Sequence, residues 1–280
     1  MGDMSAHAAV FRALLCRVGG DLDAGRLPEG VAVVHTGDLV HKGPGSAECV
    51  ELAGRFLAGS PGRFFSIWGN HDGSYIPGAP SVAGRRLVVP VPCRTRETLM
   101  SWWEQRTLPL AVALETSSGP VLITHAGLTF GFWRDLGSPD CAQVAAILNA
   151  MVGTDVVRAF RAGMIVTGAV DVAAGPCWAE TSSELLEPWL SYADHGGRIP
   201  FSQIHGHASV VADWDSAALW PHTPPAVAQT VEIDRLRRRY RLAVGGRYFT
   251  GVDWIMLAEP PVLLPPMLEL EAAGLPSWGG

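Results

Sequence analysis

The sequence predicts an α/β protein, because short apolar runs typical of buried strands alternate with segments of helical spacing. The runs 31–34, 64–68 and 121–123 are rich in Val, Ile and Phe, and polar residues follow each of them. Between the first two runs, apolar residues in 46–57 recur every three or four positions, as on the buried face of a helix. Ser46 is a suitable N-cap for that helix.

The second half of the chain continues this alternation. We expect a hairpin from strands 108–114 and 121–125, because Ser-Ser-Gly-Pro at 117–120 is a favourable turn. Helices are expected at 141–151 and 185–192. The remaining strands are expected at 201–204, 209–214, 231–243 and 248–257.

The chain is expected to form one large core rather than two small ones. A length of 280 residues suits one large α/β core, and no internal repeat divides it. We therefore predict a single domain over residues 1–259. Residues 260–280 are rich in Pro and are expected to form a C-terminal surface tail.

Composition and charge argue against several classes of protein. A net charge of −6 opposes wholesale binding to nucleic acid, which requires a basic surface. The Arg-rich run 235–241 is a local exception, which either contacts a polyanion or forms the solvated face of a strand. No apolar stretch is long enough to span a membrane, and no secretion signal opens the chain. The five cysteines are scattered and odd in number, so we expect reduced thiols and a cytoplasmic location.

Side chains that bind metal ions follow four of the predicted strands. Asp38, Asn70 and His125 come after the first three apolar runs, and His207 follows a later one. Alone, each is more typical of a turn residue or a buried polar group, but together at strand ends they predict one cleft. Carboxylate, amide and imidazole ligands favour manganese, iron or zinc over calcium. The carboxylate of Asp38 can bridge two such ions, and Asp72 is a weaker alternative acid.

Three motifs resemble one known family. They are GDLVHKGPGS at 37–46, GNHD at 69–72 and THAGL at 124–128. From about Asp3 to His207, the chain is similar to the calcineurin-like metallophosphoesterase superfamily, and most to its branch of Ser/Thr protein phosphatases and symmetrical dinucleoside tetraphosphatases. The resemblance implies a four-layer αββα sandwich, in which two mixed β-sheets are flanked by helices. It also implies hydrolysis of a phosphomonoester or phosphoanhydride, in a phosphoprotein or a dinucleoside polyphosphate, by a hydroxide that bridges two metal ions.

The resemblance further implies roles for single residues. Asp38 would bridge the two ions, for which manganese is favoured, with iron or zinc as alternatives. His71 would donate a proton to the leaving oxygen. Lys42 stands where the family usually has an Arg, and it is either a point charge for phosphate or a surface lysine. The implied metal ligands are Asp3, Asp38, Asn70, His125 and His207.

The first metal site departs from the family pattern. The family begins with a strand that runs into Gly-Asp-x-His-Gly, whereas the chain opens with Met-Gly-Asp-Met-Ser, which places Ser5 where a metal-binding His is usual. Asp3 remains a ligand candidate. His7 either replaces the missing imidazole or faces solvent in the first helical turn. Because no strand precedes Asp3, we expect the natural chain to begin upstream of Met1.

Two later positions also differ from the family. His41 replaces the acid that orients the proton donor in protein phosphatases, and Glu180 stands where a phosphate-binding Arg is usual. An acid there would repel phosphate. Arg134, the candidate for substrate binding, or the pair Arg85 and Arg86 would then have to compensate.

These departures keep a second hypothesis open. A degenerate homologue would bind metal or phosphate as an interaction module, and Ser5, His41 and Glu180 favour it. The second His of the family's Gly-His-x-His form is also absent after His207, and His205 is either an extra ligand or, as we expect, a structural residue. A nucleic-acid-processing phosphodiesterase rests on the arginine run alone.

Overall fold

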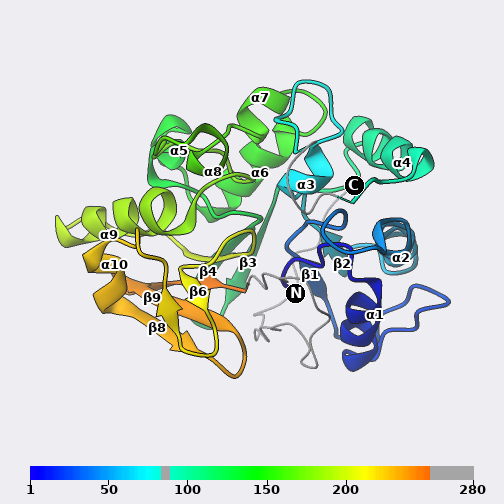
Figure 1. Cartoon of the computed structure of the whole chain (residues 1–280), viewed down its shortest axis with the longest axis horizontal. Coiled ribbons are helices and arrows are strands. Elements are labelled where there is room, and N and C mark those ends of the chain that lie inside the picture. Colours follow the sequence, from blue (N-terminus) through cyan, green and yellow to red (C-terminus); the bar gives the residue numbers. More distant parts are fainter. Residues whose placement is uncertain (83–88, 253–280) are drawn as a thin grey trace.

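The computed structural model of the chain describes residues 1–82 and 89–252, and its two principal sheets lie side by side (Figure 1). β1 and β2 form a two-stranded parallel sheet, and a six-stranded mixed sheet has the order β3-β4-β5-β10-β9-β8. β6 pairs with β7 in a small antiparallel sheet. The strands are β1 (Val33–His35), β2 (Phe64–Ser66), β3 (Ala111–Thr116), β4 (Gly119–Thr124), β5 (Ser202–His205), β6 (Val211–Asp213), β7 (Ala218–Leu219), β8 (Val231–Asp234), β9 (Arg239–Val244) and β10 (Arg247–Gly251).

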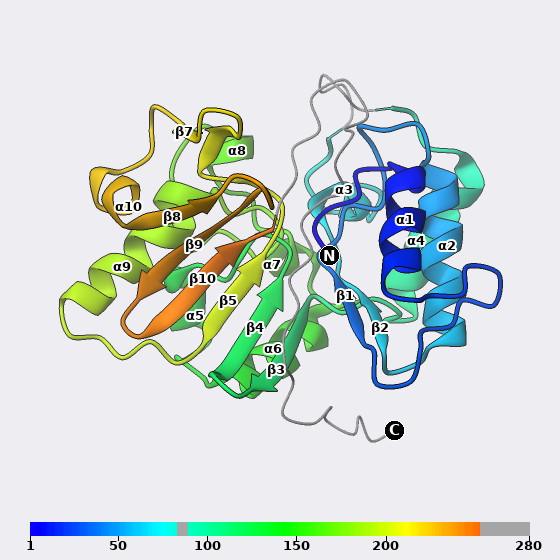
Figure 2. The same ribbon diagram turned by 90° about the horizontal axis from the view of Figure 1, so that it is seen from below.

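Helices cover the outer side of each principal sheet. α1, α2 and α4 lie beyond β1 and β2, while α5, α6 and α9 lie on the far side of the six-stranded sheet (Figure 2). The helices are α1 (Ala8–Arg17), α2 (Ser46–Gly59), α3 (Asn70–Gly73), α4 (Cys93–Glu104), α5 (Phe130–Asp135), α6 (Cys141–Met151), α7 (Val156–Ala159), α8 (Met164–Thr167), the π-helical turn η1 (Thr181–Leu186), α9 (Glu187–Asp194) and α10 (Pro225–Thr230). Within the described ranges, none of them is long and apolar enough to cross a bilayer.

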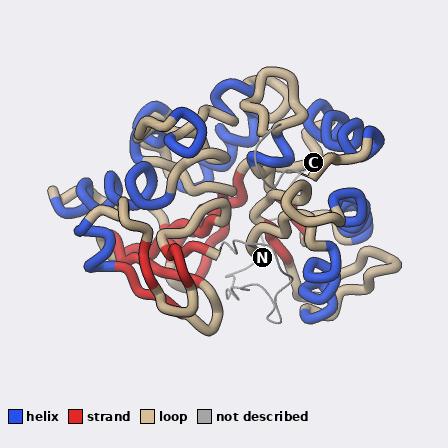
Figure 3. Tube along the Cα trace, in the orientation of Figure 1, coloured by secondary structure: helices blue, strands red, loops and turns tan. Residues whose placement is uncertain are grey.

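The two principal sheets face each other across an apolar layer of their own. Val34 and Phe65 from the small sheet pack against Val112, Ile123 and Ile204 from the large one. The strands therefore lie inside and the helices outside (Figure 3). This order of layers confirms the predicted α/β fold with two sheets flanked by helices. Over the described residues the small sheet is parallel and not mixed, because β1 and β2 alone form it.

The chain begins beside β1. The terminal ammonium of Met1 donates to the carbonyl of Val34 (2.8 Å), and the Met1 carbonyl accepts from the backbone N–H of Thr36 (3.0 Å). These two bonds follow the pattern of a parallel strand pair. Although a full strand before Asp3 is absent, the first residue thus pairs with the sheet, and the chain runs from this pair directly to Asp3.

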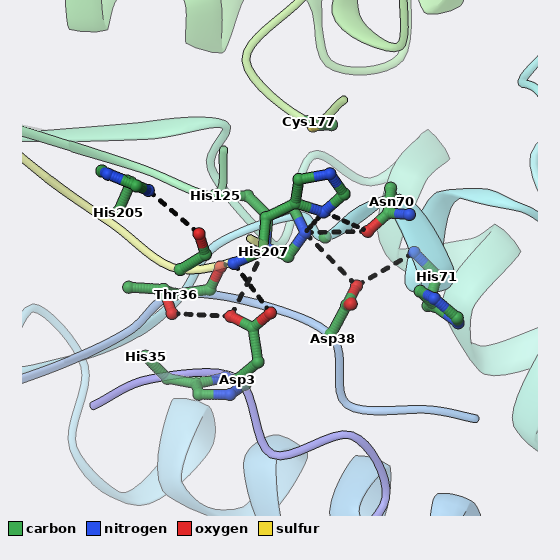
Figure 4. Close-up of polar contacts among 12 residues, drawn as sticks. Asp3, His35, Thr36, Asp38, Asn70, His71, His125, Cys177, His205 and His207 are labelled. Atoms are coloured by element: carbon green, nitrogen blue, oxygen red, sulfur yellow. Dashed lines mark hydrogen bonds and ion pairs between the residues drawn. The ribbon is translucent and has the colours of Figure 1, made fainter. Parts of the chain in front are cut away.

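Both principal sheets contain parallel strand pairs. β4 pairs with β5 and β5 with β10 in parallel register, as β1 does with β2. Parallel strands release their following loops at the same edge of a sheet. The loops after β1, β2, β4 and β5 consequently meet between the two sheets, where they build the site described below (Figure 4).

The predicted elements are largely present, with two differences. The helix expected at 141–151 is α6, and the one at 46–57 is α2, in which Ser46 is the first helical residue and Gly45 the N-cap. The Ser46 hydroxyl instead accepts from the backbone N–H of His41 (3.2 Å). The strand expected at 231–243 is two strands, β8 and β9, because a turn at 235–238 interrupts it.

That turn contains most of the arginine-rich run. Asp234 forms ion pairs with Arg237 and Arg239 (3.2 Å each), and Glu232 pairs with Arg241 (2.6 Å). Three of the five arginines in the run thus form ion pairs with the two acids of β8. The predictions for Arg85, Arg86, the end of the expected strand at 253–257 and the tail at 260–280 concern residues outside the described ranges.

Candidate metal centre

The loops after four strands bring the predicted ligands together (Figure 4). Asp38 follows β1, Asn70 begins α3 after β2, His125 follows β4 and His207 follows β5. Asp3 reaches the same place from the start of the chain, and all five side chains are buried or nearly so. The structure thus places in one cluster the residues that the sequence scatters over two hundred positions.

The ligand atoms face one another at short range. His125 Nε2 lies 2.8 Å from Asn70 Oδ1, 3.2 Å from His207 Nδ1 and 3.6 Å from Asp38 Oδ1. The Asn70 oxygen also lies 3.1 Å from His207 Nδ1. We call these four residues, Asp38, Asn70, His125 and His207, the ligand cluster.

The tautomer of His125 follows from its second nitrogen. Its Nδ1 lies 2.7 Å from the carbonyl of Thr36, which can only accept, so Nδ1 carries the hydrogen. Burial lowers the pKa of His125, so the ring is neutral at neutral pH. Its Nε2 consequently points a lone pair into the cluster.

With the Asn70 oxygen facing inward, the ligand cluster brings acceptors face to face. The Asn70 oxygen, the bare His125 nitrogen and the Asp38 carboxylate have no hydrogen to share. Turning the Asn70 amide over would bring its NH₂ group to 2.8 Å from His125 Nε2 and would satisfy these contacts. With the oxygen facing inward, the feature that resolves the repulsion is a cation, and this donor set fits a transition metal such as manganese, iron or zinc.

The Asp3 side of the site is different. Asp3, Asp38 and His125 each offer a ligand atom within 4.8 Å of the others. However, both Asp3 oxygens already accept hydrogen bonds, Oδ1 from the Thr36 hydroxyl (2.9 Å) and Oδ2 from the backbone N–H of His207 (2.9 Å). Asp3 thereby ties the first loop to the last.

Ser5, which stands at the position of an expected His, takes part in backbone contacts. Its N–H donates to the carbonyl of Asp38 (2.7 Å), and its carbonyl accepts from Gly43 (2.8 Å). Ser5 and Ala6 have φ angles of 46° and 61°, in the left-handed region. His7 is the N-cap residue of α1 and is half-buried.

The Asp38 loop is held in a strained conformation. Asp38, His41 and Lys42 have φ angles of 59°, 67° and 63°, which side chains other than Gly rarely adopt. The carboxylate of Asp72 supports it by accepting from the N–H groups of Asp38 and Leu39 (2.8 Å each) and Gly69 (3.2 Å). Asp72 therefore positions the two loops. Its carboxylate is used for these hydrogen bonds and not as a metal ligand.

Two glycines permit the close approach of these loops. A Cβ at Gly69 would lie 2.2 Å from Asp38 Oδ1, and one at Gly206 would lie 2.1 Å from Asp3 Oδ1. Real Cβ atoms do not approach oxygen so closely. Glycine at both positions lets backbone and carboxylates share the centre of the site.

The electrostatics favour an ionised Asp38. Burial would raise the pKa of Asp38, but His125, His71 and Lys42 nearby outweigh it and hold this pKa below its usual value. Lys42 is half-buried, and its charge also contributes to lowering the pKa of His71 and His207. The ammonium group is thus close enough to the ligand cluster to act on an anion bound there.

His71 lies at the edge of the cluster. Its backbone N–H donates to Asp38 Oδ1 (2.9 Å), and its ring Nδ1 lies 2.8 Å from Nδ1 of His41. His41 occupies the position at which the family's protein phosphatases have an acid, and it does contact the predicted proton donor. Its Nε2 in turn contacts the hydroxyl of Tyr75.

Other candidates lie in different surroundings. Arg134 is exposed on α5, with its guanidinium carbon 5.9 Å from the centre of the Phe130 ring, so its role in substrate binding stays a prediction. His205 contacts the Gly206 carbonyl through Nδ1 (3.0 Å) and the Tyr240 hydroxyl through Nε2 (2.6 Å). Both ring nitrogens are in use, as expected of a structural residue.

Glu180 does not present a bare charge. It is 5 % exposed and accepts from the backbone N–H groups of Ser182 (2.9 Å) and Ser183 (2.7 Å) at the start of η1. Burial would raise the pKa of Glu180, but these bonds outweigh it and keep the pKa below its usual value. The acid is therefore a helix cap, which reduces the repulsion of phosphate that the sequence suggests.

Sequence reasoning missed three supporting residues. Thr36 binds Asp3 and His125, Asp72 holds the loops of Asp38 and Gly69, and Tyr75 contacts His41. Thr36 stands directly before the first motif, and Tyr75 lies one helical turn after His71, so their positions offered a weak signal.

A comparison with protein families decides the assignment. Residues 1–147 match the model of the calcineurin-like phosphoesterase family. This chain belongs to that family. It is accordingly a metal-dependent phosphoesterase, that is, a phosphoric ester hydrolase. The matched part contains Asp3, Asp38, Asn70 and His125, whereas His207 lies beyond it.

Solved structures of similar fold include several phosphatases. A cold-active protein-tyrosine phosphatase from a psychrophilic Shewanella species is 16% identical, with a TM-score of 0.48, over 89% of this chain and 78% of that one. A putative diadenosine tetraphosphatase is 21% identical, with a TM-score of 0.40, over 90% and 91%. A metallophosphoesterase from Sphaerobacter thermophilus is 19% identical, with a TM-score of 0.37, over 89% and 72%. No curated protein sequence matches the chain.

Proposed function

We propose that this phosphoesterase hydrolyses phosphomonoesters or phosphoanhydrides, with a phosphorylated protein or a dinucleoside polyphosphate as its substrate. The observation that carries the proposal is the ligand cluster, in which acceptor atoms converge around His125 Nε2 at 2.8 to 3.6 Å. With the Asn70 oxygen facing inward, such an arrangement is stabilised by a cation bound among these atoms.

The site would hold two divalent ions, with manganese favoured and iron or zinc as alternatives. Asn70, His125 and His207 would hold one ion together with Asp38. Asp3 and the other side of the Asp38 carboxylate would hold the second. When bound, the two ions would activate a water molecule and neutralise charge on the phosphate during in-line displacement.

The chain's own residues would do the rest. Lys42 adds a positive charge near the ligand cluster, which favours binding of the phosphate as a point charge. His71, whose backbone N–H is bonded to Asp38 Oδ1, would donate a proton to the leaving oxygen. Asp72 would keep the loops of Asp38 and Asn70 in register through its three backbone hydrogen bonds.

A second candidate function is a binding module for metal or phosphate with weak turnover. It is favoured by the Asp3 side, where Ser5 supplies backbone contacts and no imidazole. The same cluster would then bind an anion through its metal without efficient hydrolysis.

One experiment separates the two functions. The purified chain would be stripped with a chelator, reloaded with Mn²⁺ and assayed with 4-nitrophenyl phosphate, while bound metal is counted by mass spectrometry. The enzyme predicts two ions and turnover that disappears with the chelator. A single ion with tight phosphate binding and no turnover would support the binding module instead.

The five cysteines support a reducing location. All of them are free thiols, three buried and two exposed. Burial raises the pKa of the Cys49 thiol above its usual value, so this thiol stays protonated at neutral pH. We therefore place the protein in the cytoplasm.

A further inference from the structure

Three side chains form a line that leads away from the ligand cluster. His71 Nδ1 lies 2.8 Å from His41 Nδ1, and His41 Nε2 lies 2.5 Å from the Tyr75 hydroxyl. His41 is 1 % exposed, while His71 and Tyr75 are half-buried. His41 is thus a buried imidazole with both nitrogens engaged.

The hydrogens in this line are not independent. Two ring nitrogens 2.8 Å apart leave room for one hydrogen between them. If Tyr75 donates to His41 Nε2, a neutral His41 carries its hydrogen on Nδ1 and donates to His71. A neutral His71 then carries its own hydrogen on Nε2. The reverse arrangement, from His71 to Tyr75, would leave His71 Nε2 bare.

The surroundings of Tyr75 favour the first arrangement. Among residues 1–82 and 89–252, His41 Nε2 is the hydrogen-bond acceptor that the Tyr75 hydroxyl contacts. Burial raises the pKa of Tyr75 and outweighs the nearby Arg96 guanidinium, so the phenol keeps a hydrogen to donate at neutral pH. A phenol that keeps its hydrogen and contacts the buried Nε2 of His41 favours the direction from Tyr75 through His41 to His71.

We propose that Tyr75 and His41 are positioning residues that hold His71 in the tautomer with its hydrogen on Nε2, ready for the leaving oxygen. This inference rests on the proposed function, because it assigns a leaving group to His71. In this inference, the hydrogen bond between position 41 and His71 runs in the opposite direction to the one that an acid at position 41 would form. A carboxylate there would accept a hydrogen from His71 Nδ1, whereas His41 donates one.

The proton balance of the step requires the whole line. As the phosphorus–oxygen bond breaks, the leaving oxygen keeps the electron pair and takes the hydrogen of His71 Nε2. His71 regains a hydrogen on Nδ1 from His41, and His41 regains one on Nε2 from Tyr75. Solvent then protonates His71 Nε2 and the hydrogens move back along the line, which restores the Tyr75 hydroxyl and both starting tautomers, so His71 and His41 remain neutral throughout.

The first test compares two leaving groups. In the Mn²⁺-loaded protein, Tyr75→Phe keeps the ring and removes the hydroxyl. We expect kcat for phenyl phosphate, a poor leaving group, to fall about tenfold, and kcat for 4-nitrophenyl phosphate to fall less than about threefold, because a good leaving group needs little protonation. His41→Phe should widen this gap to about a hundredfold.

The control is a second tyrosine that bonds a histidine. Tyr240→Phe removes the hydroxyl that contacts His205 Nε2 (2.6 Å), outside the proposed line. It should change the rates for both substrates by the same factor. An equal loss on both substrates in Tyr75→Phe as well would overturn the proposal, because a merely structural role lowers both alike.

The second test does not depend on turnover. Nitrogen–proton correlation spectra of the Zn²⁺-loaded protein report which ring nitrogen of each histidine carries hydrogen. The proposal requires hydrogen on Nε2 of His71 and on Nδ1 of His41. The opposite pair of tautomers in the unmodified chain would end it, whether or not the protein is active.

These two measurements keep the proposals apart. If the unmodified chain hydrolyses neither substrate, the proposed function fails, while the spectra still decide the tautomers of His71 and His41. If it hydrolyses both and Tyr75→Phe affects them equally, the enzyme stands and the positioning role is wrong.

Discussion

The two sides of the metal centre are built differently. Around Asn70, His125 and His207, side-chain atoms converge at 2.8 to 3.2 Å, and an Asn70 oxygen that faces inward meets the lone pair of His125 Nε2. On the other side, both oxygens of Asp3 accept hydrogen bonds from Thr36 and His207. Acceptors that repel each other favour a cation, whereas acceptors that are already satisfied gain less from one. We therefore expect one tightly held ion and one weakly held ion, which share Asp38.

The largest effect should follow from the shared residue. Asp38→Asn removes the one carboxylate that belongs to both sides, so we expect kcat to fall by about a thousandfold or more and bound metal to decrease. Mass spectrometry and turnover of 4-nitrophenyl phosphate measure the two losses. Asp213→Asn, at an exposed carboxylate on β6, is the matched control and should retain both properties. Full activity in Asp38→Asn would remove the basis of the mechanism.

His207 and His205 can be compared to test which histidine belongs to the ligand cluster. His207→Ala should weaken the tight ion by at least about a hundredfold, because it deletes one of the converging nitrogens. His205→Ala should leave metal stoichiometry unchanged and lower the free energy of unfolding by about 1 to 3 kcal/mol, because the Tyr240 hydroxyl loses its partner. Metal titration and urea unfolding of both variants test this contrast, and an equal loss of metal in both would contradict it.

One substitution should strengthen metal binding on the Asp3 side of the centre. Ser5→His adds an imidazole beside Asp3, and His tolerates the left-handed conformation that Ser5 has at φ 46°. We expect the second Mn²⁺ to bind about tenfold more tightly, as measured by calorimetric titration, with the first ion unchanged. Ser5→Ala controls for the loss of the hydroxyl. No gain in the second binding step would show that the Asp3 side is not a cation site.

The smallest effect concerns pH and stability. Burial lowers the pKa of His35 to about 3, from an ordinary value of 6.5. Between these values, the unfolded chain binds a proton that the folded chain lacks. The free energy of unfolding should therefore decrease as the pH falls, by about 1.4 kcal/mol per pH unit for this group.

Unfolding by urea between pH 6.5 and 4.5 measures this slope. His35→Gln removes the titrating group and should make the slope shallower by that amount. His195→Gln, at the exposed C-cap residue of α9, is the matched control for exchanging an imidazole for an amide. Equal slopes in His35→Gln and the unmodified chain would mean that His35 is protonated in the folded state as easily as in the unfolded one.

Much of the fold and site followed from local patterns. The bounds of α6 and the hairpin of β3 and β4 were predicted because periodicity and turn residues are properties of neighbouring positions. The convergence of Asp38, Asn70, His125 and His207 was predicted because parallel strands release their loops at one edge. The split of the expected strand at 231–243 was missed, since nothing in its hydrophobic pattern marks the turn at 235–238.

The sequence by itself determined which atoms are available: a carboxylate, an amide, two imidazoles and a serine where a further imidazole is usual. Only the tertiary structure decided how each polar group is satisfied. Glu180 caps η1 and Asp72 accepts from three backbone N–H groups, while His41 Nε2 contacts the hydroxyl of Tyr75, which lies 34 positions later in the chain. The reason is physical: a hydrogen bond depends on which backbone and side-chain groups come within 3 Å, and residues distant in sequence supply most of them here.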